Sequence, residues 1–206
     1  FIILPGSKQT IKDQIFLENS GLSQDIREYS KSNGNIVGIC GGLQMLGTTL
    51  EDPFSKEGST IYSEKTTRGI GLLPLKTTFL DKKLTRQINS ESLWPCQTKI
   101  NGFEIHNGHT NLDKTQHSLD IKPIFKNLDL GWYKENNRGG TIAGIYIHGI
   151  FENDNWRDKY INLIRKNKNL PLLNKKSISY KKKRESIINN LANEFDKHLN
   201  LKSFLS

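Results

Sequence analysis

The stretch NIVGICGGLQMLG, residues 35–47, decides the fold of this chain. The apolar run Ile36–Ile39 predicts a buried strand, and leucines at helical spacing predict a helix over Gly42–Leu50. Cys40 stands between the two and is enclosed by glycines. A buried strand does not require these glycines, so their presence indicates a turn with special steric demands after the strand.

The order Gly38-Ile39-Cys40-Gly41-Gly42 is typical of a nucleophile elbow, in which a sharp strand-to-helix turn demands small neighbours. Such a turn directs the sulfur to the carboxyl edge of the strands, where α/β sheets bind their ligands. We expect the N-terminus of the following helix to lower the pKa of the thiol, and the N–H of Gly41 to donate to an oxyanion. The alternative is a buried structural cysteine in a glycine-rich turn.

A cysteine nucleophile needs a base, and His148 is the candidate. It ends the apolar run Ile142–Ile147 and precedes a glycine, so it can face the same sheet edge as Cys40. The competing interpretation is a structural histidine in the core, whose ring nitrogens are hydrogen-bonded to neighbouring groups. No metal site is expected, because His106 and His109 have no third or fourth ligand nearby.

Strand and helix patterns alternate along the first fifty residues. This order predicts an α/β fold with a mostly parallel sheet flanked by helices. A polar loop over 51–69 and a β-rich part follow, and the chain ends in two helices with a loop at 167–176 between them. The other expected elements are the strands Phe1–Leu4, Leu72–Phe79, Thr98–Ile105, Leu128–Lys134 and Thr141–His148, a hairpin turn at Asn136–Gly140, and the helices Thr10–Leu17, Leu22–Ser32, Asn153–Lys166 and Ser179–Leu199.

We expect residues 1–166 to form one domain and residues 167–206 to add a linker and a helix that packs on it. The last helix has an apolar stripe on one face, which favours this packing. The stripe consists of Ile187, Ile188, Leu191, Phe195 and Leu199. The chain opens on FIILPG, which reads as a strand entered partway. The first elements of the domain are therefore expected in a preceding segment.

The composition excludes several classes of protein. With 34% hydrophobic and 25% charged residues, no membrane-length apolar run and no secretory leader, we expect a soluble protein. Two cysteines are too few for a disulfide framework, which favours a reducing, cytoplasmic setting. The net charge of +9 reflects a chain-wide bias, and its densest run, Lys181–Arg184, has no interleaved aromatic residues, so nucleic-acid binding is not expected.

Four segments, in chain order, carry a resemblance to a known family. The elbow and its continuation, residues 38–47, resemble the nucleophile motif of class I glutamine amidotransferases, which have a flavodoxin-like three-layer fold. Within that class the match is closest to the glutaminase domain of the cobyric acid synthase family. The other segments are LPGSKQT (4–10), similar to PGSKxT; GFEIHNGHT (102–110), similar to GYEIHxGxT; and GIYIHGIF (144–151), similar to GTYLHGxF.

The resemblance implies roles for the matching residues. Cys40 would attack the side-chain amide of glutamine to give a glutamyl thioester and ammonia. His148 would take the thiol proton, protonate the leaving ammonia and activate water. Backbone N–H groups of Gly6 or Ser7 and of Gly41 would form the oxyanion hole.

The resemblance also implies partners. Gln44, one helical turn past the nucleophile, would help to hold glutamine. The ammonia would pass to a preceding synthetase domain that binds ATP and Mg²⁺ and activates carboxylates of adenosylcobyrinic acid a,c-diamide, a corrinoid. No G-x-x-x-x-G-K-[ST] phosphate loop occurs in this chain, so we expect the ATP chemistry in preceding sequence.

One position departs from most class I glutaminases, which carry a glutamate two residues after the histidine. Here that position is Ile150, and the cobyric acid synthase branch also lacks the glutamate. The orientation of His148 then needs a backbone carbonyl, a water or Glu104 as its support. Two alternatives stay open: a related glutaminase that amidates a cell-wall lipid precursor, and a non-catalytic interaction domain of the same fold. The PGSK start, the Glu-Ile-His order and the terminal helix count against the first of these.

Overall fold

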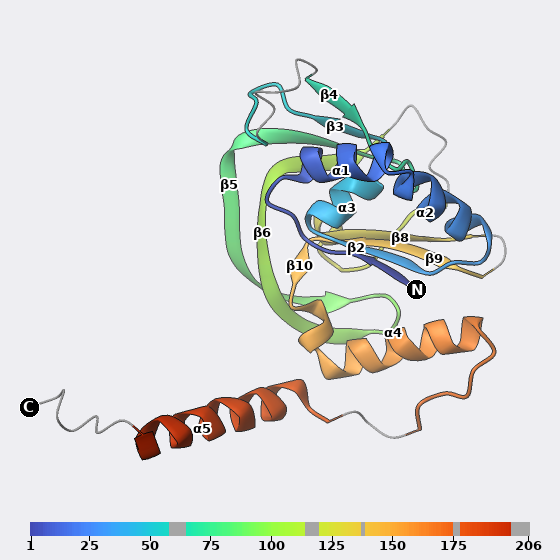
Figure 1. Ribbon diagram of the computed structural model, residues 1–206. Helices are drawn as coiled ribbons and strands as arrows, with labels where there is room; N and C mark the ends of the chain where they lie inside the picture. The colour runs from blue at the N-terminus through green and yellow to red at the C-terminus, as the bar shows by residue number, and fades with distance from the viewer. Residues whose placement is uncertain (58–64, 114–119, 137–138, 175–177, 199–206) are drawn as a thin grey trace, which may run out of the picture.

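The computed structural model describes residues 1–57, 65–113, 120–136, 139–174 and 178–198. It shows an α/β fold with two mixed sheets and helices packed around them (Figure 1). The middle of the expected hairpin turn, part of the expected loop at 51–69 and the end of the expected last helix lie outside these residues.

The first sheet carries the nucleophile at the end of a central strand. Its strands are, in order, β1 (Ile2–Leu4), β2 (Ile36–Ile39), β9 (Thr141–Ile145), β8 (Gly131–Glu135) and β7 (Lys122–Pro123). β2 pairs in parallel with both β1 and β9, whereas β8 pairs antiparallel with β9 and β7. The parallel pairs bring the carboxyl ends of three strands to one edge of the sheet.

The second sheet wraps around one side of the first. Its order is β10 (Ile147–His148), β6 (Thr98–Leu112), β5 (Leu75–Ser92), β3 (Thr49–Glu51) and β4 (Thr66–Arg68). All its pairs are antiparallel except β3 with β5. The long β5–β6 hairpin curves past the helices in Figure 1, and its arc passes the end of β2.

The five α-helices are α1 (Thr10–Asn19), α2 (Leu22–Lys31), α3 (Gly41–Leu46), α4 (Asp154–Asn167) and α5 (Tyr180–His198). Two short 3₁₀ turns, Leu128–Leu130 and Ile150–Glu152, precede β8 and α4.

Successive residues of the central strands face opposite cores, as a strand buried on both faces requires. Ile36 and Ile142 belong to the apolar cluster that contains residues of α2 and α3. Val37 and Ala143 belong to the cluster that contains Trp156 and other residues of α4. The central strands are therefore covered by helices on both faces, which leaves their carboxyl edge as the place for a site.

The expectation of a mostly parallel sheet is wrong in detail, because both sheets are mixed. It rested on the first two strands, which are parallel, while the later β-rich part forms antiparallel pairs. The helix expected over Gly42–Leu50 ends at Leu46, where the N–H of Thr48 donates to the carbonyl of Leu75 at 2.7 Å and the chain joins β5.

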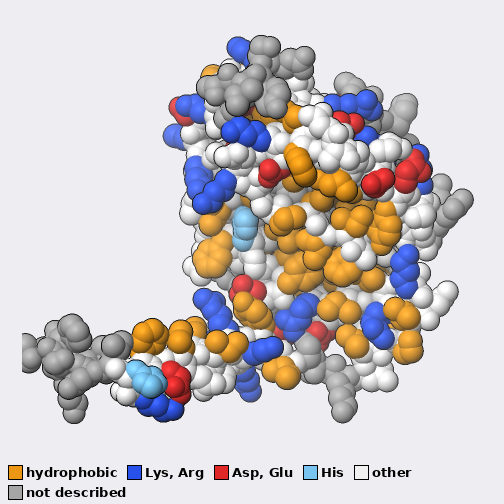
Figure 2. Space-filling view, viewed as in Figure 1, with side chains coloured by type: hydrophobic (Ala, Val, Ile, Leu, Met, Phe, Trp, Pro, Cys, Tyr) orange, Lys and Arg blue, Asp and Glu red, His pale blue; other side chains and the backbone are white. Residues whose placement is uncertain are grey.

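The last helix does not pack as expected. No residue of α5 is buried, and the side chains of its apolar stripe are exposed, with Ile187, Leu191 and Phe195 at 57, 57 and 51%. Its first N–H, on Tyr180, donates to Asp154 at 2.9 Å, and from there the helix extends away from the body of the molecule (Figures 1 and 2). The domain boundary at residue 166 stays a prediction.

Among the described residues, no helix combines the length and the apolar character that a membrane crossing requires.

Candidate active site

The glycines around Cys40 are explained by close approach of backbone. A Cβ on Gly38 would lie 2.4 Å from the carbonyl oxygen of Gly42, and a Cβ on Gly42 would lie 2.0 Å from the carbonyl oxygen of Leu4. Cys40 itself has φ +52°, a conformation that a residue with a side chain rarely adopts. The chain therefore turns sharply between β2 and α3, and strained backbone of this kind is concentrated at functional sites.

The segment after β1 lies against this turn. A Cβ on Gly41 would meet the backbone nitrogen of Ser7 at 2.8 Å. The Gly41 N–H lowers the pKa of the neighbouring Cys40 thiol. The hydroxyl of Ser7 accepts from the N–H of Gln9 at 2.8 Å and donates to Asp13, which fixes this segment at the start of α1. Gly6, Ser7 and Gly41, the expected oxyanion-hole residues, are thus neighbours of the thiol.

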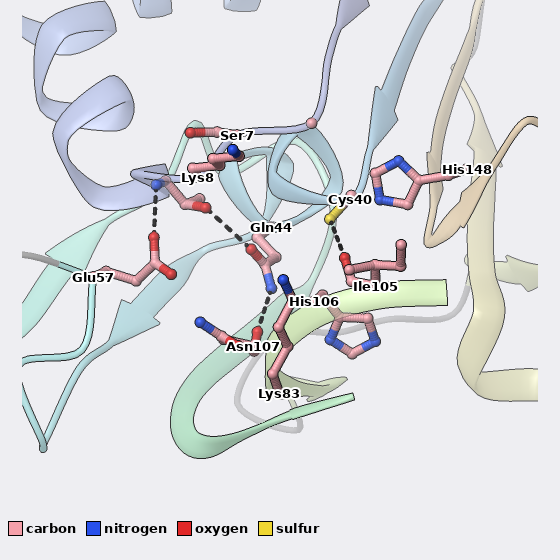
Figure 3. A pocket seen from close by; sticks show the side chains of 12 residues that line it. Ser7, Lys8, Cys40, Gln44, Glu57, Lys83, Ile105, His106, Asn107 and His148 are labelled. Carbon is pink, nitrogen blue, oxygen red and sulfur yellow. Dashed lines mark hydrogen bonds between the residues drawn. The ribbon is translucent and has the colours of Figure 1, made fainter. Parts of the chain in front are cut away.

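His148 lies beside Cys40. A Cβ on Gly6 would lie 3.2 Å from Cε1 of His148 and 3.6 Å from Cβ of Cys40, so both residues lie against the same glycine. Figure 3 shows the ring of His148 next to Cys40. The register of β10 against β6 sets His148 opposite Phe103. Nε2 of His148 is buried and has no hydrogen-bond partner among the described residues, which leaves one ring nitrogen available for proton transfer.

The pKa of the Cys40 thiol is raised, contrary to the expectation that the helix end lowers it. The sulfur donates to the carbonyl of Ile105 at 3.2 Å. Burial raises the pKa of Cys40 to about 11, and the nearby charge of Glu57 raises it further, while the Gly41 N–H and Lys83 act in the opposite direction. The desolvation of the sulfur outweighs a helix of only six residues.

Because this pKa is raised, alkylation of Cys40 in the resting protein should accelerate with pH. At neutral pH the reactive thiolate is a small fraction that grows about tenfold per unit until pH approaches 11. We expect the rate of iodoacetamide incorporation at Cys40, followed by peptide mass spectrometry, to rise without a plateau from pH 6 to about pH 9. A plateau near neutrality would instead mean that a stable thiolate–imidazolium pair exists before substrate binds.

Glu104, which was suggested as a support for His148, contacts other residues in the structure. Its buried carboxylate is hydrogen-bonded to Nε2 of His106 at 2.9 Å and forms an ion pair with Arg86. His106 stacks on the ring of Tyr146, with centroids 3.9 Å apart. Within the described part of the chain no hydrogen bond joins Glu104 to His148. Glu104 thus braces the strand that carries Ile105, and its support of His148 stays a prediction.

The position of the usual third triad residue is apolar and closed. Ile150 is buried in the cluster that contains Trp156 and Tyr160. A carboxylate there would be buried among aromatic rings, so this fold does not offer the usual route for orienting His148.

Gln44 lies in the wall of the cavity with its amide already engaged. Nε2 donates to the carbonyl of Asn107 at 3.0 Å and to the hydroxyl of Tyr146 at 3.2 Å, and Oε1 accepts from the hydroxyl of Thr10 at 3.4 Å. It is buried and ties α3 to α1 and β6. Direct contact of Gln44 with glutamine stays a prediction, and its observed contacts give it a structural role in the wall.

These groups surround one cavity of about 650 Å³, a size typical of small-molecule pockets. The cavity holds the thiol and His148, and Figure 3 shows both on the same side of it. Sequence reasoning missed several residues of its lining, chiefly Glu57, because a single carboxylate in a polar loop carries no distinguishing signal. The full lining is Gly6, Ser7, Lys8, Thr10, Cys40, Gln44, Glu57, Lys83, Ile105, His106, Asn107 and His148.

No group of three or more His, Cys, Asp or Glu side chains suited to a metal ion occurs in the part of the chain that the structure describes.

Comparisons with known proteins agree with the geometry. The signature of the CobB/CobQ-like glutamine amidotransferase domain matches residues 1–156. Among curated proteins, the chain is 80% identical over 206 residues to a cobyric acid synthase of Prochlorococcus marinus strain MIT 9215. The match covers 100% of this chain and 40% of that protein. A cobyric acid synthase of strain NATL2A is 45% identical over 200 residues, again with 40% of its length covered. The chain therefore spans about 40% of the length of these relatives.

A solved structure described as the crystal structure of a glutamine amidotransferase superposes with a TM-score of 0.54. The match covers 82% of this chain and 78% of that one at 10% identity, so it bears on the fold alone. By the extent of the matching signature, this chain belongs to the family of CobB/CobQ-like glutamine amidotransferase domains.

Proposed function

We propose that the chain is the glutaminase domain of a cobyric acid synthase, which hydrolyses glutamine through a thioester on Cys40 and supplies ammonia for amidation. The observation that carries the proposal is that Cys40 and His148 both lie against Gly6, in one cavity at the carboxyl edge of the central strands. The high identity to cobyric acid synthases supports the choice of acceptor.

The first step of the proposed reaction forms a carbon–sulfur bond. The sulfur of Cys40 attacks the side-chain carbonyl carbon of glutamine while His148 takes the thiol proton. The negative charge that develops on the carbonyl oxygen is stabilised by the N–H groups of Gly41 and of Gly6 or Ser7. The raised pKa of the resting thiol supports proton transfer at the moment of attack, because little thiolate stands ready beforehand.

The intermediate then loses ammonia. His148 returns its proton to the leaving nitrogen, the carbon–nitrogen bond breaks, and a glutamyl thioester remains on Cys40. The same imidazole next activates a water molecule, which attacks the thioester and releases glutamate with the sulfur again carrying a proton. The unpartnered Nε2 supports a role for His148 in each of these transfers.

The ammonia acceptor lies beyond this chain in the proposal. By resemblance, a synthetase part of the longer protein binds ATP and Mg²⁺ and activates corrinoid carboxylates of adenosylcobyrinic acid a,c-diamide, and we propose a cytoplasmic setting for the whole. An assay with this corrinoid and with a lipid-linked cell-wall precursor as competing acceptors separates the two glutaminase assignments. Amidation of the lipid alone would overturn the corrinoid assignment.

A glutamine analogue tests the chemistry itself. The electrophilic analogue 6-diazo-5-oxo-L-norleucine should label Cys40 in the protein of full length and abolish glutamine-dependent amidation, with protection by excess glutamine. The absence of a carboxylate at Ile150 keeps the non-catalytic alternative open, and that alternative predicts that Cys40 stays unlabelled. If Cys40 stays unlabelled while amidation still consumes glutamine, the proposed role of Cys40 is wrong.

A further inference from the structure

The wall of the cavity contains a buried carboxylate, that of Glu57, which the proposed reaction does not use. Its residue is only 7% exposed, and Oε2 accepts from the N–H of Thr10 at 2.8 Å. The side chain of Asn107, on β6, lies near enough to lower the pKa of Glu57. The carboxylate of Asp52 accepts from the N–H groups of Lys56 and Glu57 at 2.8 and 2.9 Å. The loop thus holds Glu57 in place against α1 and β6.

The carboxylate of Glu57 has no cationic partner among the residues that the structure describes. In the described ranges no Lys, Arg or His side chain forms an ion pair with it. Burial raises the pKa of Glu57, against the opposing effect of the hydrogen bonds from Thr10 and Asn107. A buried charge without a counter-charge is costly, so such a group calls for a cation beside it.

Glu57 faces the same cavity as the nucleophile. Thr10, whose N–H binds Glu57, also donates its hydroxyl to Gln44, and Gln44 follows Cys40 by one turn of α3. Figure 3 shows Gln44 between Glu57 on one side and Cys40 on the other. Glu57, Gln44 and Cys40 therefore follow one another along one wall of the cavity.

Resting on the proposed function, we propose that Glu57 binds the α-ammonium group of glutamine and so selects an α-amino acid amide over simpler amides. The ammonium is the only cationic group of glutamine and lies at the end of the molecule remote from the scissile amide. Lys8 and Lys83 are exposed at the same cavity and provide positive charge for the α-carboxylate. The α-ammonium group then lies beside a carboxylate, and the α-carboxylate lies beside lysine side chains.

The test compares L-glutamine with glutaramate, which has the same chain, carboxylate and terminal amide but no α-amino group. In the protein of full length, kcat/KM for ammonia release should favour glutamine by at least about 30-fold. Glu57→Gln keeps an oxygen for the Thr10 N–H but removes the charge. It should lower kcat/KM for glutamine by at least about 30-fold, mainly through KM, and leave glutaramate within about 3-fold.

Glu51→Gln is the matched control, because Glu51 is a partly exposed carboxylate of β3 that pairs with Lys76 away from the cavity. It should leave the glutamine preference intact. Amidation with added ammonium salts and iodoacetamide alkylation of Cys40 check that each variant is folded. If Glu57→Gln is unfolded, the test rests on two other measurements: the preference of the wild type for glutamine over glutaramate, and the same preference in Glu57→Asp. Glu57→Asp keeps the charge, so it should still prefer glutamine.

Two results overturn the assignment of Glu57 alone: a wild type that hydrolyses glutaramate as well as glutamine, and a folded Glu57→Gln that keeps the full preference. A wild type that releases no ammonia from glutamine overturns the proposed function, and the assignment of Glu57 falls with it.

Discussion

Replacement of Cys40 by alanine is expected to lower glutamine-dependent amidation by at least about 10⁴-fold in the protein of full length, because the covalent route through the thioester is lost. Amidation supported by ammonium salts should be retained, since that reaction bypasses glutamine hydrolysis. Alanine keeps the Cβ that the turn already accommodates at φ +52°, so the elbow should keep its shape. The measurement is the rate of amide formation with each nitrogen source.

Cys96→Ala is the matched control. Cys96 is the other free cysteine, only partly buried and not part of the cavity lining, so its replacement should leave both rates unchanged. Loss of both rates in Cys40→Ala would contradict the proposal and would mean that this cysteine matters for folding. Retention of the glutamine-dependent rate would assign the nucleophile to another residue.

Gly42→Ala is expected to have the largest effect on stability. Its Cβ would lie 2.0 Å from the carbonyl oxygen, 2.7 Å from the carbonyl carbon and 2.9 Å from the Cβ of Leu4, all atoms of β1 or its end. Neither β1 nor α3 can move away without breaking the packing of the central sheet, so the free energy of unfolding should fall by about 3 kcal/mol or more. Urea unfolding followed by circular dichroism measures the change.

Gly71→Ala separates steric overlap from the general cost of losing a glycine. Gly71 has φ +76° but nothing within 4 Å of its virtual Cβ, so only the backbone strain of about 1–2 kcal/mol is expected. The account of the elbow requires the loss in Gly42→Ala to be clearly larger. Equal losses in the two variants would mean that the turn does not depend on the close approach of Leu4.

The features that sequence could predict are local ones. The strand Ile36–Ile39 has the predicted bounds, and the glycines that follow it are those that backbone contacts demand. Only glycine fits at these close contacts, so the pattern of glycines in the sequence reveals the turn. The close approach of Ser7 to Gly41 was expected only from the family resemblance, because residues so far apart in the sequence follow no spacing rule.

The features that sequence missed depend on distant chain. The lengths of β5 and β6 come from their pairing with each other, since much of the hairpin is exposed and lacks a buried strand's pattern. The pKa of Cys40 was misjudged because burial against β6, including the carbonyl of Ile105, outweighs the helix end. Glu57 lines the cavity only because its loop folds against α1, a long-range contact that local sequence does not reveal.

The apolar stripe of α5 shows a different limit of sequence reasoning. Amphipathic spacing predicted an apolar face correctly, since the exposed apolar residues of that helix include Ile187, Ile188, Leu191 and Phe195. The spacing does not say what covers such a face, and the described residues of the domain do not cover it.

The most direct test of the central claim is to trap the intermediate. Glutamine labelled in its carbon chain is mixed with the protein of full length, the reaction is stopped with acid within the first turnovers, and the Cys40 peptide is analysed by mass spectrometry. We predict a glutamyl adduct on Cys40 that disappears on treatment with hydroxylamine, as a thioester does. Release of ammonia from glutamine with no adduct on Cys40, or with an adduct on a different residue, would contradict the account.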